Sequence, residues 1–347
     1  MQDKISNPIF IVGSPRSGTS ILTWCLGQHP NMLALPESSW MGDFAINLAI
    51  SHKIGTARGN RSVLSAMDIQ SGEFFANFGQ SINDLIVSHR QDLERKRGGA
   101  SGAEASGARG AFKTTRSESE PKARWVDGTP EYSLHICGLR KLFPEARFIH
   151  LVRDVSSVVR SMLNFHRVAG IHLVANEEEA YNYWLRTVGA CLQGERAYGP
   201  SVVRRMRYSD FTDRPEPAMR SLLDFLGEPY AQQCLEPLAQ RINSSNVPAD
   251  FKADDPATDP TVVEKATRLS LEVEKIPQPA EAVPAAADEM EAAFGERVQY
   301  LGSIDSAYQR AKQMIRTLQN SGLPLYAVTE AVFGIADLFV DVLSQFS

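Results

Sequence analysis

Short apolar runs alternate with segments of helical period along the first two thirds of the chain. Residues 8–12 (PIFIV) are an apolar run bounded by proline and glycine, which predicts a buried parallel strand, and residues 19–27 predict the helix that follows. Residues 147–152 predict a second strand, and a third is expected within residues 201–211. Strands that alternate with helices predict an α/β fold, a three-layer domain with a central parallel sheet flanked by helices.

Capping residues suggest where the later helices begin and end. After the second strand, Ser156 or Ser157 is expected to cap a helix that runs to about Phe165. Pro215 at the start of PEPAMRSLLDFL and Gly227 just past its end predict another complete helix.

Two segments interrupt this alternation. Residues at about 96–124 are rich in glycine and hold almost no apolar side chain, so we expect a flexible insertion that is either a lid or a plain connector. Residues 244–290 are rich in proline, alanine and acidic residues, and predict loops and short helices. We expect one domain over residues 1–300 that carries the insertion, followed by a helical extension over residues 301–347 that packs on this domain or on the partner of a homodimer.

The apolar run near the C-terminus, YAVTEAVFGIADLFVDVLSQF, raises the question of a membrane. Glu330, Asp337 and Asp341 fall on one face of a helix, which predicts an amphipathic helix and no transmembrane segment. No basic segment followed by a long apolar one stands near the N-terminus, so we expect a cytoplasmic protein.

Composition narrows the classes of partner. The 347 residues are 43% apolar and 22% charged, with a formal charge of -5, which disfavours a nucleic-acid partner. The cysteines Cys25, Cys137, Cys191 and Cys234 lie far apart without a CxxC pair, so neither a zinc site nor a disulfide framework is expected.

The first strand runs into the loop GSPRSGTS, which has the frame of a phosphate-binding loop. A glycine-bounded turn at a helix N-terminus directs backbone N–H groups and the positive end of the helix dipole at an anion. Gly13 and Gly18 have the spacing of the GxxxxGK[ST] loop, but Thr19 replaces the lysine and the positive charge stands at Arg16. The domain is therefore expected to be P-loop-like, with an anion bound without a metal.

A second candidate anion site follows the second strand. Arg153 ends that strand, and Ser161 lies eight residues later, inside the next helix. An arginine and a hydroxyl placed in this way would converge on one phosphate at the crevice where open α/β sheets bind ligands. Together with the loop, this pair suggests one ligand with phosphates at both ends.

Both motifs resemble those of one enzyme family. IFIVGSPRSGTSIL is similar to the 5′-phosphosulfate loop of sulfotransferases that use 3′-phosphoadenosine 5′-phosphosulfate (PAPS), and RFIHLVRDVSSVVRSML to their 3′-phosphate motif, chiefly in the bacterial, carbohydrate and tyrosyl-protein branches. The resemblance extends over roughly residues 8–230. It implies that PAPS is the co-substrate, with no metal. It assigns residues to the 5′-phosphosulfate (Arg16, Ser17, Gly18, Thr19, Ser20) and to the 3′-phosphate (Arg153, Ser161).

The resemblance also suggests the catalytic groups. Glu37 stands close to the catalytic glutamate of the carbohydrate and tyrosyl-protein branches, which makes it the expected general base. Arg16 would stabilise the leaving group. Glu131 and His135 are rival candidates for the base.

One position departs from the family pattern. Many relatives have DKTP where this chain has Asp127-Gly128-Thr129-Pro130, and the family's lysine would assist the leaving group. Either Arg16 suffices, or Lys113 or Lys122 of the insertion takes that role, or catalysis is impaired.

The resulting hypothesis is a PAPS-dependent sulfotransferase that moves a sulfuryl group, in line and without a metal, to a hydroxyl of a small-molecule or carbohydrate acceptor. A kinase or NTPase is disfavoured by the missing lysine. A nucleotide-binding protein without turnover is a third alternative, motivated by Gly128. Nothing in the sequence identifies the acceptor.

Overall fold

The computed structural model describes residues 7–93, 123–239 and 247–320. Its chain divides into two compact units, one made of residues up to Ala45 and from Asp68 to Glu291, the other of Ile46–Met67 and the residues from Ala292 onward. The predicted division at residue 300 is not tested by this partition and stays a prediction.

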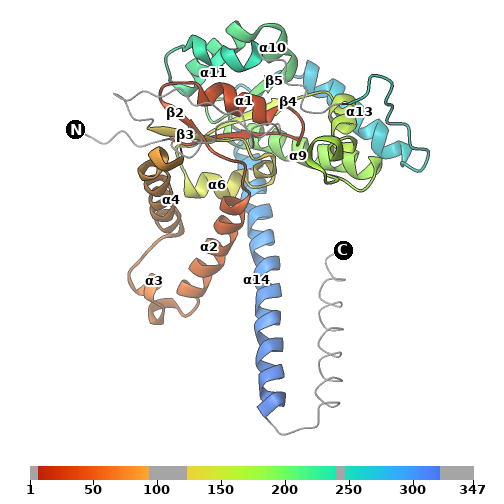
Figure 1. The fold of residues 1–347 in the computed structure, drawn as a ribbon. Coiled ribbons are helices and arrows are strands. Elements are labelled where there is room, and N and C mark those ends of the chain that lie inside the picture. Colours follow the sequence, from red (N-terminus) through yellow and green to blue (C-terminus); the bar gives the residue numbers. More distant parts are fainter. Residues whose placement is uncertain (1–6, 94–122, 240–246, 321–347) are drawn as a thin grey trace. The chain divides into compact units, whose positions relative to one another are not determined.

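A parallel five-stranded sheet forms the middle of the larger unit (Figure 1). The strands are β1 (Ile9–Val12), β2 (Met32–Ala34), β3 (Arg124–Asp127), β4 (Arg147–Val152) and β5 (Val203–Arg207). Their order across the sheet is β2-β3-β1-β4-β5, and every pairing is parallel. Because β1 lies between β3 and β4, the ends of three strands meet where the glycine-bounded loop begins.

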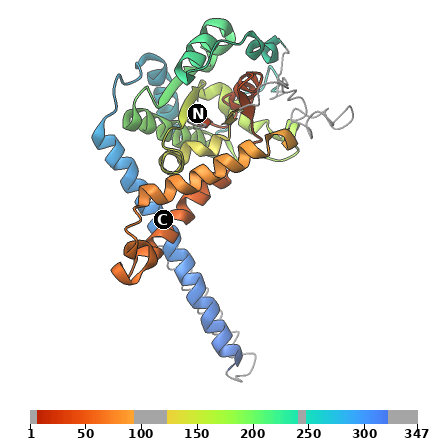
Figure 2. The ribbon, with the colours of Figure 1, turned by 90° about the vertical axis from the view of Figure 1, so that its left-hand side faces the viewer.

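Helices cover both faces of this sheet. One face carries α1 (Thr19–Gly27), α10 (Tyr208–Asp213), α11 (Pro215–Leu226), η3 (Gln232–Leu235) and α12 (Glu236–Ala239). The other side carries α4 (Ser71–Ser88), η2 (Pro130–Leu134), α6 (Ile136–Leu142) and α9 (Glu177–Tyr198), with α7 (Val155–Leu163) and α13 (Pro260–Lys275) beside α9. The short helix α8 (His166–Ala169) follows α7. Both views show α10 and α11 on the opposite side of the sheet from α4 (Figure 1, Figure 2). The predicted three-layer α/β fold is confirmed.

Alternation along β1 explains the two covered faces. Ile9 and Ile11 point into the cluster formed with α1 and α11, whereas Phe10 points to the other side. There the Phe10 ring stacks on Phe148 at 5.2 Å and meets Tyr132 edge-on at 5.6 Å. A strand buried on both faces carries apolar residues throughout, as β1 does.

The smaller unit consists of helical segments. It contains η1 (Gly59–Arg61), α3 (Val63–Ala66) and parts of α2 (Trp40–Thr56) and α14 (Pro284–Asn320). Gly55 packs directly against Leu64, and Gly302 lies next to Ile50. The apolar run at residues 326–346 falls outside the described residues. Among the helices that the structure does describe, none is long and apolar enough to cross a membrane.

Two expectations about helices are wrong. Asp154, not Ser156 or Ser157, caps α7: its carboxylate accepts a hydrogen bond from the Ser157 N–H at 2.8 Å. The strand ends only two residues before Asp154, so the helix begins earlier than the serines suggested. Residues 244–290 also hold a full helix, α13, because Ala266, Ser270 and Val273 share one buried face.

A buried charge network ties β4 and β5 to α9. The Glu195 carboxylate lies 2.5 Å from His150 Nδ1 and accepts from Arg205 Nε at 3.0 Å, and both His150 and Glu195 are fully buried. Burial alone would lower the pKa of His150, but Cys191 and Glu195 outweigh it and raise that pKa to about 9. His150 therefore stabilises the fold as a cation below the imidazole's unfolded pKa near 6.5, and this contribution is lost as pH rises through 9.

Replacing Glu195 by glutamine should cost about 3 kcal/mol of unfolding free energy, because a buried imidazolium and guanidinium would lose their counter-charge. Urea denaturation at pH 7 measures this. Glu216→Gln is the matched control, since the exposed Glu216–Arg220 pair should contribute at most about 0.5 kcal/mol. Equal effects of the two substitutions would contradict the role assigned to the network.

Candidate active site

The loop between β1 and α1 requires glycine at both ends. Gly13 has φ +151°, and a Cβ there would lie 2.4 Å from the Leu151 carbonyl oxygen of β4. Gly18 has φ +106°, and a Cβ there would lie 2.6 Å from the Tyr208 ring. Any side chain at either position would collide with β4 or with the residue that follows β5. The glycines thus let the loop lie closely against the carboxyl ends of two neighbouring strands.

The loop presents several polar groups to an anion. Gly18 caps α1 without a side-chain hydrogen bond, and the first N–H groups of a helix have no intrahelical acceptor. The Ser14 and Ser17 hydroxyls are buried and find no hydrogen-bond partner among the described residues. A buried hydroxyl left unpaired costs about 1–3 kcal/mol, which a bound phosphate or sulfate would relieve. The loop therefore offers a site that a phosphate or sulfate group would fit.

Ser133 holds this loop in place from η2. Its hydroxyl accepts from the Gly13 N–H at 2.8 Å, and it lies 2.9 Å from the Gly13 carbonyl oxygen. The start of the loop is therefore fixed to the segment that follows β3.

Arg16 and Ser161 are direct neighbours. Arg16 Nε donates to Ser161 Oγ at 3.0 Å, and the guanidinium lies over the Phe165 ring at 4.9 Å. The resemblance assigns Arg16 to the 5′ end of PAPS and Ser161 to the 3′-phosphate. With this hydrogen bond in place, the Arg16 side chain points toward the residues assigned to the 3′-phosphate. Burial lowers the pKa of Arg16, Glu37 raises it and Arg153 lowers it further. The Arg16 guanidinium thus interacts with both of these charges.

Arg153 completes the positive side of the site. Its Nη1 donates to the Arg16 carbonyl oxygen at 3.3 Å, and its guanidinium lies 4.5 Å from the centroid of the Tyr208 ring. Trp184 on α9 donates its indole N–H to the Arg153 carbonyl oxygen at 3.3 Å. Two arginines from different strand ends therefore face one region, where an anion with two phosphates would offset their repulsion.

Glu37, in the segment between β2 and α2, lies beside the first turn of α1. It follows β2 by three residues, is exposed, and its Oε1 accepts from Ser20 Oγ at 2.6 Å. The structure thus brings the predicted base next to Ser20, which is predicted to bind the 5′-phosphosulfate. Of the rivals, Glu131 accepts from the Tyr183 hydroxyl of α9 at 3.0 Å, and His135 packs against Gly42 of α2.

A buried carboxylate lies behind Glu37. Asp127 ends β3, and its Oδ1 accepts from the Thr129 hydroxyl at 2.6 Å, while Thr129 Oγ1 accepts from the Ser38 N–H at 2.7 Å. Burial raises the pKa of Asp127 to about 7, against the opposing effect of its hydrogen bonds with Thr129. The chain of contacts from Asp127 to Ser38 holds the segment that carries Glu37.

The side chain of Thr23 leaves no room for a side chain at Gly128. A Cβ at Gly128 would lie 2.0 Å from Thr23 Oγ1, which itself donates to the Thr19 carbonyl oxygen at 2.9 Å. A lysine at this position, as in the family's DKTP pattern, would therefore collide with α1. Lys113 and Lys122, the proposed substitutes for that lysine, lie outside the described residues.

Sequence reasoning missed four contributors, Ser14, Asp127, Phe165 and Tyr208. Tyr208 could have been found, because it directly follows β5 at the same edge of the sheet as Arg153. Ser14 belongs to the loop motif itself. No sequence pattern indicates that Phe165 contacts Arg16.

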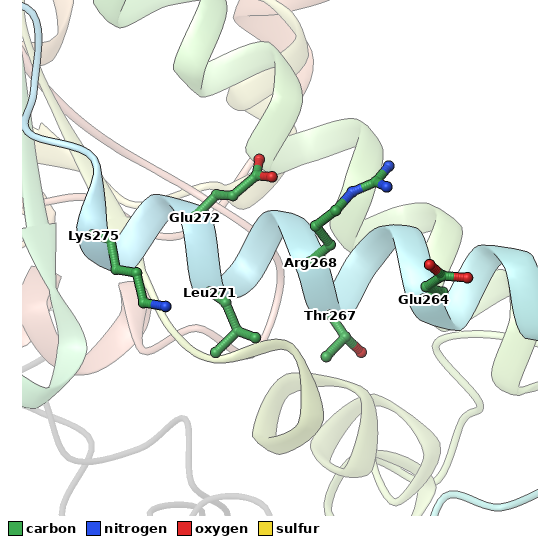
Figure 3. Close-up of a pocket in the computed structure, with 6 residues that line it drawn as sticks. All are labelled: Glu264, Thr267, Arg268, Leu271, Glu272 and Lys275. Carbon is green, nitrogen blue, oxygen red and sulfur yellow. The ribbon is translucent and has the colours of Figure 1, made fainter.

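Two hollows on the described surface lie elsewhere. One, of about 500 Å³, is lined by six residues of α13 alone (Figure 3), among them Arg268 and the half-exposed Leu271. The other, of about 400 Å³, lies between the β5–α10 region and the segment after α13. Neither hollow is lined by residues of the β1–α1 loop. The site is therefore identified by its charged and hydrogen-bonding side chains and not by the volume of a cavity.

The Thr23–Gly128 contact predicts a strong coupling. Gly128→Ala alone should destabilise the protein by about 1–3 kcal/mol through overpacking, and the added substitution Thr23→Ala should recover most of this loss. Urea denaturation of the two single variants and the double variant measures the coupling. Strictly additive effects would show that the two residues do not meet.

Asp127 predicts a specific pH dependence of stability. Its pKa is raised in the fold, so its favourable contribution is present below about pH 4 and is lost as pH rises through about 7. Asparagine does not titrate, so the Asp127→Asn variant should not lose this stability. The difference in unfolding free energy, variant minus wild type, should therefore increase between about pH 4 and pH 7. A series of denaturant titrations from pH 4 to 8 tests it, with substitution of the half-exposed Asp210 by asparagine as control.

Comparison with known proteins gives the context of this site. A sequence model described as "Sulfotransferase family" matches residues 8–232. A putative protein-tyrosine sulfotransferase of Caenorhabditis briggsae is 20% identical over 239 residues, which cover 65% of this chain and 68% of that protein. The omega-hydroxy-beta-dihydromenaquinone-9 sulfotransferase Stf3 of Mycobacterium tuberculosis is 28% identical over 105 residues, 28% of this chain and 27% of the other.

Solved sulfotransferase structures align at low similarity. The sulfotransferase domain of the Synechococcus PCC 7002 olefin synthase is 20% identical, with a TM-score of 0.39 over 85% of this chain and 97% of that domain. STF9 of Mycobacterium avium is 17% identical, with a TM-score of 0.41 over 81% of this chain and 79% of the other. Values this low add no weight to the assignment, which the family match over most of the chain carries. The chain belongs to the sulfotransferase family.

Proposed function

We propose that the protein transfers the sulfuryl group of PAPS to a hydroxyl of a small-molecule or carbohydrate acceptor. Membership of the family supports sulfuryl transfer in general. The observation that favours PAPS is the grouping of Arg16, Arg153 and Ser161 around one glycine-bounded loop, with Glu37 at its helix.

The residues of the loop and of α7 would bind the nucleotide. The N–H groups at the start of α1 and the hydroxyls of Ser17, Thr19 and Ser20 would hold the 5′-phosphosulfate. Arg153 and Ser161 would hold the 3′-phosphate. Arg16, which lies between the two groups, would leave Ser161 and turn to the 5′ end when the nucleotide binds.

The transfer itself would be a single in-line displacement. The acceptor oxygen forms a bond to sulfur while the bond from sulfur to the 5′-phosphate oxygen breaks, and the hydroxyl proton passes to the Glu37 carboxylate. Negative charge develops on the departing phosphate, where Arg16 and the loop N–H groups would stabilise it. Ser20 would orient Glu37 through the hydrogen bond that joins them.

A metal has no assigned step in this proposal. Thr19 stands where nucleotide hydrolases have lysine, and the positive charge required at the phosphates is supplied by arginine. The metal-free reaction, the cytoplasmic location and the homodimer stay predictions; turnover that survives EDTA would support the first.

The relatives' names describe two kinds of hydroxyl acceptor. One names protein tyrosine and the other an omega-hydroxylated menaquinone. Both are hydroxyl compounds, which supports a hydroxyl acceptor for this chain without selecting between the classes. The alternative of a nucleotide-binding protein without turnover rests on Gly128, and one acceptor that gains label from PAPS would eliminate it.

Nucleotide binding and turnover should separate in two variants. Arg153→Ala should weaken binding of adenosine 3′,5′-bisphosphate by about 10-fold or more, because a charge-assisted phosphate contact is lost. Glu37→Gln should keep that affinity within about threefold and lower turnover by about 100-fold or more. Isothermal titration and incubation with radiolabelled PAPS and a fractionated metabolite extract measure the two effects.

Arg204→Ala serves as the control. Arg204 lies on the outer strand β5 and donates a hydrogen bond to Ser221 of α11, so its loss should change neither quantity. The reverse pattern in the two variants would overturn the roles assigned to Arg153 and Glu37. A crystal soaked with the nucleotide in which neither Arg16 nor Arg153 reaches a phosphoryl oxygen would overturn the proposal as a whole.

A further inference from the structure

Four aromatic side chains form a continuous row on α2 and α4, which we call the aromatic ladder. Its members are Trp40, Phe44, Phe78 and Phe74, all within the larger unit. Successive ring centroids lie 6.0, 6.2 and 5.0 Å apart, and each ring meets the next edge-on. Edge-to-face contacts of this kind hold rings in a defined arrangement, so the ladder is an ordered surface.

The ladder is open to solvent at two of its members. Trp40 is 46% exposed and Phe78 is 41% exposed. The other three tryptophans, Trp24, Trp125 and Trp184, are buried in the core. Single exposed apolar residues are common, but contiguous exposed rings are typical of surfaces that bind an apolar partner.

Two polar side chains beside the ladder bond to their own helix. The Asn77 amide donates to the Glu73 carbonyl oxygen at 3.0 Å, and the Ser81 hydroxyl donates to the Asn77 carbonyl oxygen at 3.0 Å. A sugar needs hydrogen-bonding partners for its many hydroxyls when it leaves water. These two side chains are thus engaged with their own helix, and the rings themselves present mainly carbon, which favours an apolar body over a carbohydrate.

The ladder begins next to the proposed base. Trp40 opens α2 three residues after Glu37, whose carboxylate contacts Ser20 at the start of α1. The intervening segment is anchored, because the Ser38 N–H donates to Thr129 Oγ1 at 2.7 Å. A molecule lying along the ladder with its hydroxyl at the Trp40 end would thus present that hydroxyl near Glu37.

We propose that the aromatic ladder binds the apolar body of the sulfuryl acceptor, and that the acceptor is an alcohol or phenol with an extended alkyl or aryl body. That the acceptor's hydroxyl reacts rests on the proposed function. Binding of the apolar body to the ladder does not depend on it, so this binding is measured directly, without sulfuryl transfer.

Trp40 provides the readout for this test, as it is the tryptophan of the ladder. Titration of the full-length protein with 1-decanol should change the emission of Trp40 and saturate, whereas 1-butanol and methyl β-D-glucoside should not produce a saturable change. The Trp40→Phe variant should lose the signal but still bind 1-decanol by calorimetry.

Phe78→Ser should weaken 1-decanol binding by about 10-fold or more, because a large exposed ring no longer covers the alkyl chain. Leu271→Ser is the matched control: Leu271 is 51% exposed on α13, outside the ladder, and should leave binding unchanged. Both variants should bind adenosine 3′,5′-bisphosphate as the wild type does, which separates failure at the ladder from failure of the nucleotide site.

Three results would overturn the inference. Saturable binding of the glucoside but not of 1-decanol would assign the ladder to a sugar. No saturable binding of either probe would show that the ladder is not an acceptor surface. A wild-type dimer that sedimentation velocity shows to dissociate on Phe78→Ser would identify the ladder as the contact between two copies of the chain.

Discussion

The loop between β1 and α1 can form only where its backbone lies directly against the ends of β4 and β5. Gly13 leaves no room for a Cβ beside the Leu151 carbonyl oxygen, and Gly18 none beside Tyr208. This close approach brings Arg16 beside Ser161, and places Arg153 within reach of the Arg16 carbonyl oxygen. Every contact on the nucleotide side of the proposed site depends on it.

Charges of both signs meet at this edge of the sheet. Arg16 and Arg153 repel each other, while Glu37 attracts Arg16 and disfavours the ionised form of Asp127. Side chains from the carboxyl ends of four of the five parallel strands thus interact electrostatically. A dianionic phosphate between the arginines would lower the energy of this arrangement, which accounts for the affinity we infer for a bisphosphorylated nucleotide.

The two substrates would be bound by different parts of the chain. Nucleotide contacts come from the ends of β1 and β4 and from α1 and α7, whereas the acceptor surface is formed by α2 and α4, which connect β2 to β3. Glu37 lies between these parts, held on one side by Ser20 and on the other through Ser38 and Thr129. Thr23 occupies the space that a side chain at position 128 would need.

Local sequence was sufficient to predict the strands at residues 8–12 and 147–152, the helix at 19–27 and the three-layer class, because apolar periodicity and glycine and proline positions report burial and turns directly. The α7 cap was predicted wrongly because the capping position depends on where the preceding strand ends. Helix α13 was missed because a composition rich in acidic residues and alanine obscures its buried face. Asp127 and Phe165 could be placed at the site only by the tertiary structure. Contacts between strand ends more than a hundred residues apart depend on the order of strands in the sheet, and that order is set by packing of the whole chain and not by any local stretch of it.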